Sequence, residues 1–221
     1  PPLPEPRTAH LRVASLEAQC AQAPDDEALA DRLRIARRIA ANSHYYEVAR
    51  AFGRLVGEAE GSAGNRLALV TGGGPGLMEA ANRGAYDKGA RTVGLNITLP
   101  HEQYPNPYVP PGLCMRLRYF AIRKLHFLLR ARALVVFPGG YGTLDELFET
   151  LTLIQTRKIE PLPVVLVGQT YWTRIFDADA LVEEGMIAPE DRDLFWFAET
   201  AEEIWADILR WYDRAGKPLT P

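Results

Sequence analysis

The sequence predicts an α/β fold in which a central parallel sheet carries helices on both of its faces. Short apolar runs rich in β-branched residues, such as 134–137 and 164–167, alternate with longer segments whose apolar residues recur at helical spacing. Glycine clusters follow two of these runs directly, after residues 71 and 138. This alternation indicates parallel strands joined by crossover helices, and therefore a three-layer, Rossmann-like sandwich with a ligand at the carboxyl ends of the strands.

Length and composition favour one domain and a small ligand. The 221 residues are 47% hydrophobic and 24% charged, which suffices for a single core over residues 1–221, with 1–41 as a variable helical extension. The net charge of −3 gives no footprint for nucleic acid. No apolar run reaches membrane-spanning length, and the start PPLPEP lacks the apolar core of a signal peptide. We therefore expect a cytoplasmic protein with neither a nucleic-acid nor a membrane partner.

Cysteine and histidine give no metal-binding pattern. Cys20 and Cys114 are far apart in the sequence, and we expect both to be reduced. The four histidines are scattered, and none belongs to a metal-ligand motif. The sequence predicts no metal site and no cofactor.

The first half of the chain is predicted to be mainly helical. Residues 8–20 and 25–41 are expected to form helices that break near Pro24, although the segment LRIARRIA at 33–40 could instead contain a short strand. Residues 44–60 place their apolar side chains on one helix face, which should pack on the sheet. A buried strand at 67–71 then leads through a glycine turn into the next helix.

The second half continues the alternation. The predicted elements are a strand at 91–97, a proline-rich irregular loop at 99–112, a helix at 115–131, strands at 134–137 and 164–167, helices at 171–176 and 178–184, an edge strand at 194–197 and a last helix at 201–214. In the helix at 115–131 we expect Phe120, Leu125 and Leu129 to point inward. Glu102, in the irregular loop, is a candidate ligand for a ribose or a base, although a solvated loop carboxylate explains it equally well.

The stretch 133–152 is the centre of the functional argument. An apolar strand ends at Pro138, and glycines at 139, 140 and 142 can adopt backbone angles closed to other residues. They also allow main-chain N–H groups to approach a ligand closely. Thr143 is placed to cap a helix whose apolar periodicity begins at Leu144.

A helix that begins after a glycine turn exposes free N–H groups, and phosphate is the anion most often bound there. Glu146 lies about one turn into this helix, within reach of a ribose or of an attacking water. An ordinary tight turn, with Glu146 simply compensating the helix dipole on a solvated face, is the alternative.

Three motifs together carry a family resemblance. Residues 138–146, PGGYGTLDE, resemble the PGGxGTxxE signature of the LOG family, a family often labelled lysine decarboxylase. The Arg123–Lys124 pair matches the Arg-Lys pair of that family, and Gly72–Met78 matches its GGGxG[LI]M turn. Characterised members are cytokinin riboside 5'-monophosphate phosphoribohydrolases, which release a free base and ribose 5-phosphate.

The resemblance implies roles for individual residues. Arg123 and Glu146 would be catalytic, and a second set would bind the substrate and its phosphate. This second set is Gly72, Gly73, Gly74, Gly76, Met78, Glu102, Lys124, Gly139, Gly140, Tyr141, Gly142, Thr143 and Asp145. The resemblance also implies a homodimer or a multiple of dimers.

Alternatives remain open for the function. The substrate would be a nucleoside 5'-monophosphate, with AMP as the alternative to a cytokinin riboside monophosphate. Relatives of this kind open with a strand that ends in a Gly-Ser turn, and this sequence lacks such a turn. A nucleotide-binding protein without turnover is therefore a second hypothesis. Lysine decarboxylase activity is not expected, because no lysine has a recognisable pyridoxal context.

Overall fold

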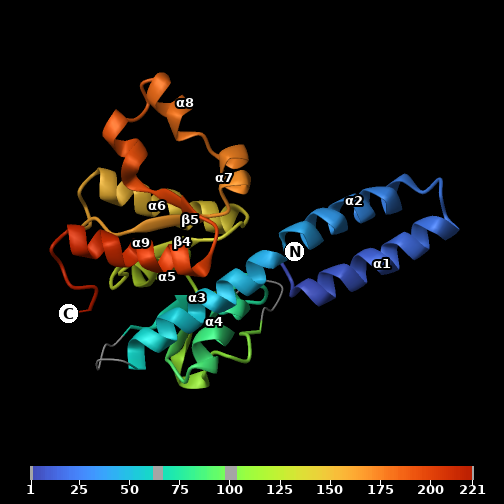
Figure 1. The fold of residues 1–221 in the computed structure, drawn as a ribbon, viewed down its shortest axis with the longest axis horizontal. Helices are drawn as coiled ribbons and strands as arrows, with labels where there is room; N and C mark the ends of the chain where they lie inside the picture. Colours follow the sequence, from blue (N-terminus) through green and yellow to red (C-terminus); the bar gives the residue numbers. More distant parts are fainter. Residues whose placement is uncertain (1, 62–66, 98–103, 221) are drawn as a thin grey trace.

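A computed structural model describes residues 2–61, 67–97 and 104–220, and Figure 1 shows their arrangement. The strands are β1 (Leu69–Thr71), β2 (Thr92–Ile97), β3 (Cys114–Leu117), β4 (Leu134–Val136), β5 (Val164–Val167) and β6 (Trp196–Ala198). The α-helices are α1 (Pro6–Gln22), α2 (Glu27–Asn42), α3 (His44–Gly61), α4 (Leu77–Asp87), α5 (Phe120–Leu128), α6 (Tyr141–Gln155), α7 (Gln169–Ile175), α8 (Ala178–Glu183) and α9 (Ala201–Arg214). Short 3₁₀ helices span Pro111–Leu113 and Pro189–Leu194.

The strands are parallel, as predicted, and they form two groups. Backbone hydrogen bonds join β1, β2 and β3 in that order, and β4, β5 and β6 in that order. Every recorded strand pair is parallel. The prediction of an α/β fold with parallel strands and flanking helices is confirmed. In place of one continuous central sheet, however, the described residues form two three-stranded sheets.

Alternating side chains of β5 explain the layered architecture. Val165 and Val167 enter a core that also contains Leu69 of β1 and buried residues of α3, α4 and α9. Val164 and Leu166 point to the opposite face, where they pack with Leu147 of α6 and other residues. A strand covered on both faces reads as a continuous apolar run, which is why the segment 164–167 could be identified from the sequence. The first core spans both sheets and holds them together.

The predicted helix at 115–131 is wrong in its first part. Residues 114–117 form β3, which pairs with β2 in the register Gly94↔Cys114 to Ile97↔Leu117. α5 begins only at Phe120. Pairing with the free edge of β2 satisfies backbone groups that a helix would satisfy locally, and this long-range partner is invisible in the local periodicity.

The expected orientation of α5 is also wrong. Phe120, Leu125 and Leu129 are 51%, 56% and 66% exposed, and no residue of α5 is buried. Arg123 and Lys124 instead face the body of the protein and are only partly accessible. α5 therefore turns its functional pair inward and an apolar surface outward.

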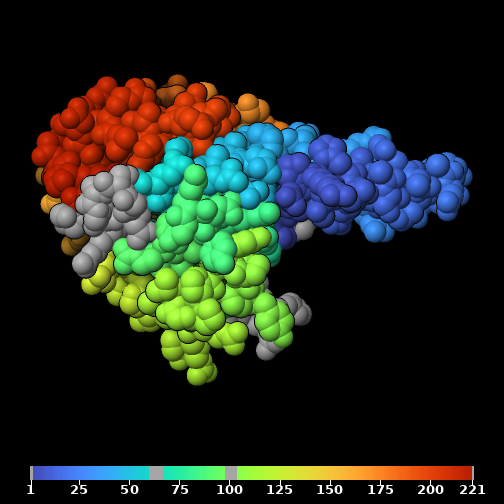
Figure 2. All heavy atoms as spheres, turned by 60° about the horizontal axis from the view of Figure 1, so that its bottom comes forward, coloured from blue at the N-terminus to red at the C-terminus, as the bar shows by residue number. Residues whose placement is uncertain are grey.

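Helices α1 and α2 form a hairpin that projects from the rest of the molecule (Figures 1 and 2). Asp26 caps α2 by accepting a 3.0 Å hydrogen bond from Leu29 N, and residues 33–40 are helical rather than a strand. The two helices share a small core around Leu16, Leu29 and Ala36. The start of the chain lies at the base of this hairpin, where a β-carbon at Gly76 would come within 2.7 Å of Pro2 Cβ.

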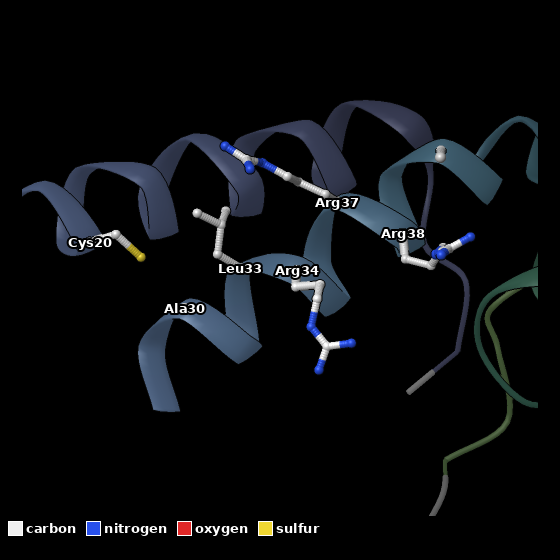
Figure 3. Close-up of a pocket in the computed structure, with 7 residues that line it drawn as sticks. Cys20, Ala30, Leu33, Arg34, Arg37 and Arg38 are labelled. Carbon is white, nitrogen blue, oxygen red and sulfur yellow. The ribbon is translucent and has the colours of Figure 1, made fainter. Parts of the chain in front are cut away.

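A cavity of about 620 Å³ opens between α1 and α2 (Figure 3). Arg34 and Arg37 line it, and each is already paired with an acidic residue of the hairpin, Asp31 at 3.0 Å and Glu17 at 2.8 Å. It contains none of the residues that the sequence predicts for the functional site.

Candidate functional site

The first glycine turn follows β1 and is fixed by the buried Asn106. The backbone N–H of Asn106 donates to Gly73 O at 2.7 Å, and its side-chain Nδ2 donates to Gly74 O at 3.0 Å. Thr71 Oγ1 accepts from Gly73 N at 2.9 Å. Gly73 has a φ of +71°, which side chains disfavour, so glycine is required there. These hydrogen bonds hold the first glycine turn in place where it leads into the N-terminus of α4.

The second glycine turn follows β4 and leads into α6. Gly140 is the N-cap and the helix begins at Tyr141, so Thr143 lies in the first turn and does not cap it, contrary to the prediction. The expected special backbone angles are also wrong here, because Gly139, Gly140 and Gly142 do not have positive φ. These glycines matter because they have no side chain, which leaves space next to the backbone.

That space differs between the glycines of this turn. A β-carbon at Gly139 would lie 2.1 Å from Thr143 Oγ1, so this glycine permits close packing of the turn. At Gly140 and Gly142, no atom of the described residues would lie within 4 Å of an added β-carbon, so the backbone there faces an open region. Tyr171 Oη donates to Gly139 O at 2.5 Å and anchors the turn from α7. An open glycine backbone at a helix N-terminus suits an anion.

Arg123 lies beside the first glycine turn and interacts electrostatically with Glu146, which follows the second turn. Its Nε donates to Leu95 O of β2 at 2.9 Å, and a β-carbon at Gly72 would lie only 2.6 Å from its Nη2. The guanidinium carbon stands 5.1 Å from the centre of the Phe127 ring. Burial lowers the pKa of Arg123, and the carboxylate of Glu146 opposes this effect. Arg123 remains a cation, since an arginine pKa stays far above neutrality.

Glu146 is the matching anion on α6. Burial raises the pKa of its carboxyl above the usual value, and the charge of Arg123 partly reverses this rise. Among the described residues, its carboxylate has no recorded hydrogen bond or ion pair at contact distance. The carboxylate of Glu146 is therefore available to a ligand. It is half-buried, has no bonding partner among the described residues and lies near the half-buried Arg123.

Lys124 and Asp145 bind each other. The Nζ of Lys124 lies 2.6 Å from Asp145 Oδ1 and 3.5 Å from Glu149 Oε2, and the hydrogen bond that Lys124 donates to Asp145 raises the pKa of Lys124. This pair ties α5 to α6 and thereby sets the position of Arg123 relative to Glu146. Both side chains are thus engaged with the protein.

The remaining predicted residues differ in their surroundings. Met78 lies at the first turn, where a β-carbon at Gly72 would come within 2.9 Å of its sulfur, and Gly76 is the N-cap of α4. Tyr141 is 92% exposed at the second turn. Glu102 lies outside the described residues.

Sequence reasoning missed three residues of this region. Asn106 and Tyr171 hold the two turns through hydrogen bonds to glycine carbonyls. Asn96 is a buried polar residue near the carboxyl end of β2. A polar side chain in a run such as VGLNI was the available signal, because buried polar groups require partners.

The described residues contain neither a metal-binding cluster nor a membrane-spanning helix. No group of three or more histidine, cysteine or acidic side chains there is placed to hold a metal ion. No helix in the same part of the chain is long and apolar enough to cross a bilayer.

Comparisons with known proteins identify the family to which this chain belongs. A sequence profile of the family described as "Possible lysine decarboxylase" matches residues 78–208, more than half of the chain. A rice protein, the probable cytokinin riboside 5'-monophosphate phosphoribohydrolase LOGL3 of Oryza sativa subsp. japonica, is 31% identical over 157 residues, which cover 68% of this chain and 74% of the relative. The chain belongs to the LOG family.

Two further comparisons concern sequence and fold. The cytokinin riboside 5'-monophosphate phosphoribohydrolase LOG3 of Arabidopsis thaliana is 31% identical, over 62% of this chain and 64% of its own length. The X-ray structure of TM1055 superposes with a TM-score of 0.53 at 21% identity, over 76% of this chain and 89% of that chain. The latter likeness supports the α/β fold alone. The span matched by the family profile includes Arg123, Glu146 and the second glycine turn, and it begins at Met78, just after the first glycine turn.

Proposed function

We propose that this protein hydrolyses the N-glycosidic bond of a nucleoside 5'-monophosphate, either a cytokinin riboside monophosphate or AMP. Water adds to the anomeric carbon of the ribose, the bond to the base breaks, and the base leaves with a proton. The products are the free base and ribose 5-phosphate. The observation that carries the proposal is the carboxylate of Glu146, which has no bonding partner among the described residues and lies near the half-buried Arg123.

Glu146 acts on the reacting carbon. Cleavage of an N-glycoside passes through a ribosyl cation-like state, which a nearby carboxylate stabilises while it also accepts a proton from the attacking water. Both roles require the ionised form. Arg123 opposes the effect of burial and keeps more of the carboxyl ionised near neutral pH.

The glycine turns hold the phosphate. Gly140 and Gly142 leave the backbone open at the N-terminus of α6, where N–H groups and the helix dipole favour a negative charge. Binding of this remote phosphate fixes the ribose in a reactive pose, so its energy is used in the chemical step.

A pyridoxal-dependent decarboxylase would need an available lysine. Lys88 pairs with Glu58 at 2.7 Å and Lys217 with Glu160 at 2.6 Å, while Lys124 pairs with Asp145. The remaining lysine, Lys158, is exposed. None of these surroundings resembles a Schiff-base site, so the family description does not guide the proposal.

Base release from AMP and from isopentenyladenosine monophosphate, followed by chromatography, tests the function directly. We expect release from at least one monophosphate and a catalytic efficiency at least 100-fold lower with the matching nucleoside, because the nucleoside lacks the anchored phosphate. Equal turnover of nucleoside and monophosphate would contradict the assigned role of the glycine turns. Binding of monophosphates without any base release would leave the non-catalytic nucleotide-binding protein as the function.

We also propose that the protein is a homodimer, or a multiple of dimers, formed through the outward face of β3 and α5. Exposed apolar side chains are concentrated on this segment: Met115, Tyr119, Phe120, Ile122, Leu125 and Leu129. Monomers rarely leave so many neighbouring apolar residues in water. A second copy that covers this face would lie against the helix that carries Arg123.

Light scattering on the wild type and on the double variant Ile122→Glu/Leu125→Glu tests the dimer. We expect the wild type to be at least dimeric at micromolar concentration and the double variant to be monomeric, because two charges cannot be buried unpaired in an apolar interface. Leu11→Glu, an equally exposed position on α1, is the control and should leave the mass unchanged. A monomeric wild type would refute the interface.

A further inference from the structure

Asn96 carries an unexplained polar group in the centre of the protein. The residue is only 4% exposed, and its amide nitrogen Nδ2 has no hydrogen-bond partner among the residues that the structure describes. Neighbouring buried asparagines are satisfied: Asn82 accepts from Thr71 Oγ1 at 2.7 Å, and Asn106 donates to Gly74 O. Buried amides without a partner are rare in folded proteins, so a group of this kind calls for a ligand that completes it.

The position of Asn96 indicates which ligand that is. Its Nδ2 lies 3.9 Å from the place of a β-carbon at Gly73, so the amide lies directly beside the first glycine turn. The preceding residue, Leu95, accepts the Nε hydrogen bond of Arg123. Asn96 thus stands at the carboxyl end of β2, next to both the glycine turn and the arginine of the candidate site.

The surrounding groups favour an anionic oxygen as the acceptor. The carbonyls of Gly73 and Gly74 are already bonded to Asn106, and the N-terminus of α4 contributes partial positive charge. Arg123 adds a full positive charge beside Gly72. In these positively charged surroundings, the amide N–H of Asn96 is suited to donate a hydrogen bond to a negatively charged acceptor.

We propose that Asn96 is a substrate-binding residue whose Nδ2 donates to a phosphate oxygen lying against Gly72–Gly74. This assignment rests on the proposed function for the identity of the full substrate, but phosphate binding can be measured without turnover. The phosphate is then held from two sides, by the second glycine turn and by Asn96 with the first. The contact discriminates between monophosphates and nucleosides.

Calorimetric titration of the full chain with ribose 5-phosphate and with inorganic phosphate tests the contact, with adenosine as the ligand that lacks phosphate. We expect Asn96→Asp and Asn96→Leu to weaken ribose 5-phosphate binding roughly 10- to 100-fold, the range for a lost hydrogen bond to a charged group. The aspartate variant should be the weaker, because its charge repels the phosphate. Inorganic phosphate should follow the same order, and adenosine affinity should not change.

The melting temperature of the unliganded protein separates a binding role from a structural role. Asn96→Leu removes an unpaired amide and should leave the melting temperature equal or higher. Asn82→Leu is the matched control, because the oxygen and the nitrogen of its amide are both hydrogen-bonded, and it should lower the melting temperature. If Asn96→Leu destabilises the protein as much as Asn82→Leu and binds ribose 5-phosphate like the wild type, Asn96 is structural and the proposal is refuted.

The hydrolase proposal and the Asn96 proposal fail in different ways. A wild type that binds ribose 5-phosphate through Asn96 but releases no base would overturn only the hydrolase. A wild type that binds neither ribose 5-phosphate nor inorganic phosphate at millimolar concentration would overturn the Asn96 contact. Equal loss of adenosine and ribose 5-phosphate affinity in both variants would show a general disturbance of the site and would also overturn it.

Discussion

Replacement of Glu146 by glutamine is expected to reduce base release by about 100- to 10,000-fold, the usual contribution of a positioned acid or base. Glutamine keeps the size of the side chain but can neither accept the proton from water nor stabilise the ribosyl cation. Substrate affinity should change far less than turnover, since the phosphate contacts come from the glycine turns. Steady-state kinetics with the better monophosphate, followed by chromatography of the free base, gives both quantities.

The pH dependence of the same variant provides a second measurement. Because burial raises the folded-state pKa of Glu146 above its unfolded value, ionisation of this group costs stability as pH rises through that window. Glu146→Gln should therefore melt higher than the wild type at neutral pH, and the difference should vanish at acidic pH. Wild-type turnover should fall as pH drops through the pKa of Glu146. The control is Glu183→Gln on exposed α8, which should retain normal turnover; an active Glu146→Gln would exclude the carboxylate mechanism.

Substitution of Gly139 by alanine should damage both stability and activity. The added carbon would overlap Thr143 Oγ1 at 2.1 Å and Thr143 Cβ at 2.7 Å, so the first turn of α6 must move. Overpacking of this kind costs about 1–3 kcal/mol, which corresponds to a fall in melting temperature of roughly 3–10 °C. Displacement of the turn by about 1 Å is expected to lower catalytic efficiency about 100-fold. Calorimetry and kinetics measure the two effects.

Gly140→Ala is the contrasting variant, because no atom in the described part of the chain lies within 4 Å of its added carbon. Its melting temperature should match that of the wild type. Its affinity for monophosphates should nevertheless fall, since the new methyl group enters the space assigned to the phosphate. If Gly139→Ala proved as stable as Gly140→Ala, the close packing of this turn would not be what requires glycine at position 139.

The sequence predicted those parts of the fold that depend on local pattern. Helices α3 and α9 have regular apolar faces, and α9 also begins with a capping box formed by Thr200 and Glu203. β5 is covered on both faces and reads as an uninterrupted apolar run. β3 could not be predicted in this way, because residues 114–117 become a strand only through pairing with β2. The same limit applies to α5, whose apolar side chains alone do not indicate whether they face a core or a partner.

The candidate site was predictable to a similar extent. Motif resemblance pointed to Arg123 and Glu146, and the fold brings them into electrostatic contact. Asn96 was not predictable, since its importance arises from being unpaired beside Gly73 in three dimensions. The angles expected for Gly139 were wrong because composition indicates only that glycine is needed, and the reason lies in the neighbouring Thr143.

Because the strands are divided into two sheets, we expect the width of the site to be adjustable. The first glycine turn extends from the sheet of β1, and the second extends from the sheet of β4. Among the described residues, side-chain packing and not a continuous backbone ladder sets the distance between these sheets. Packed layers can slide by small amounts without breaking hydrogen bonds, which is the physical basis of shear motion. A substrate bound at both turns would therefore draw the sheet of β1 and the sheet of β4 closer together.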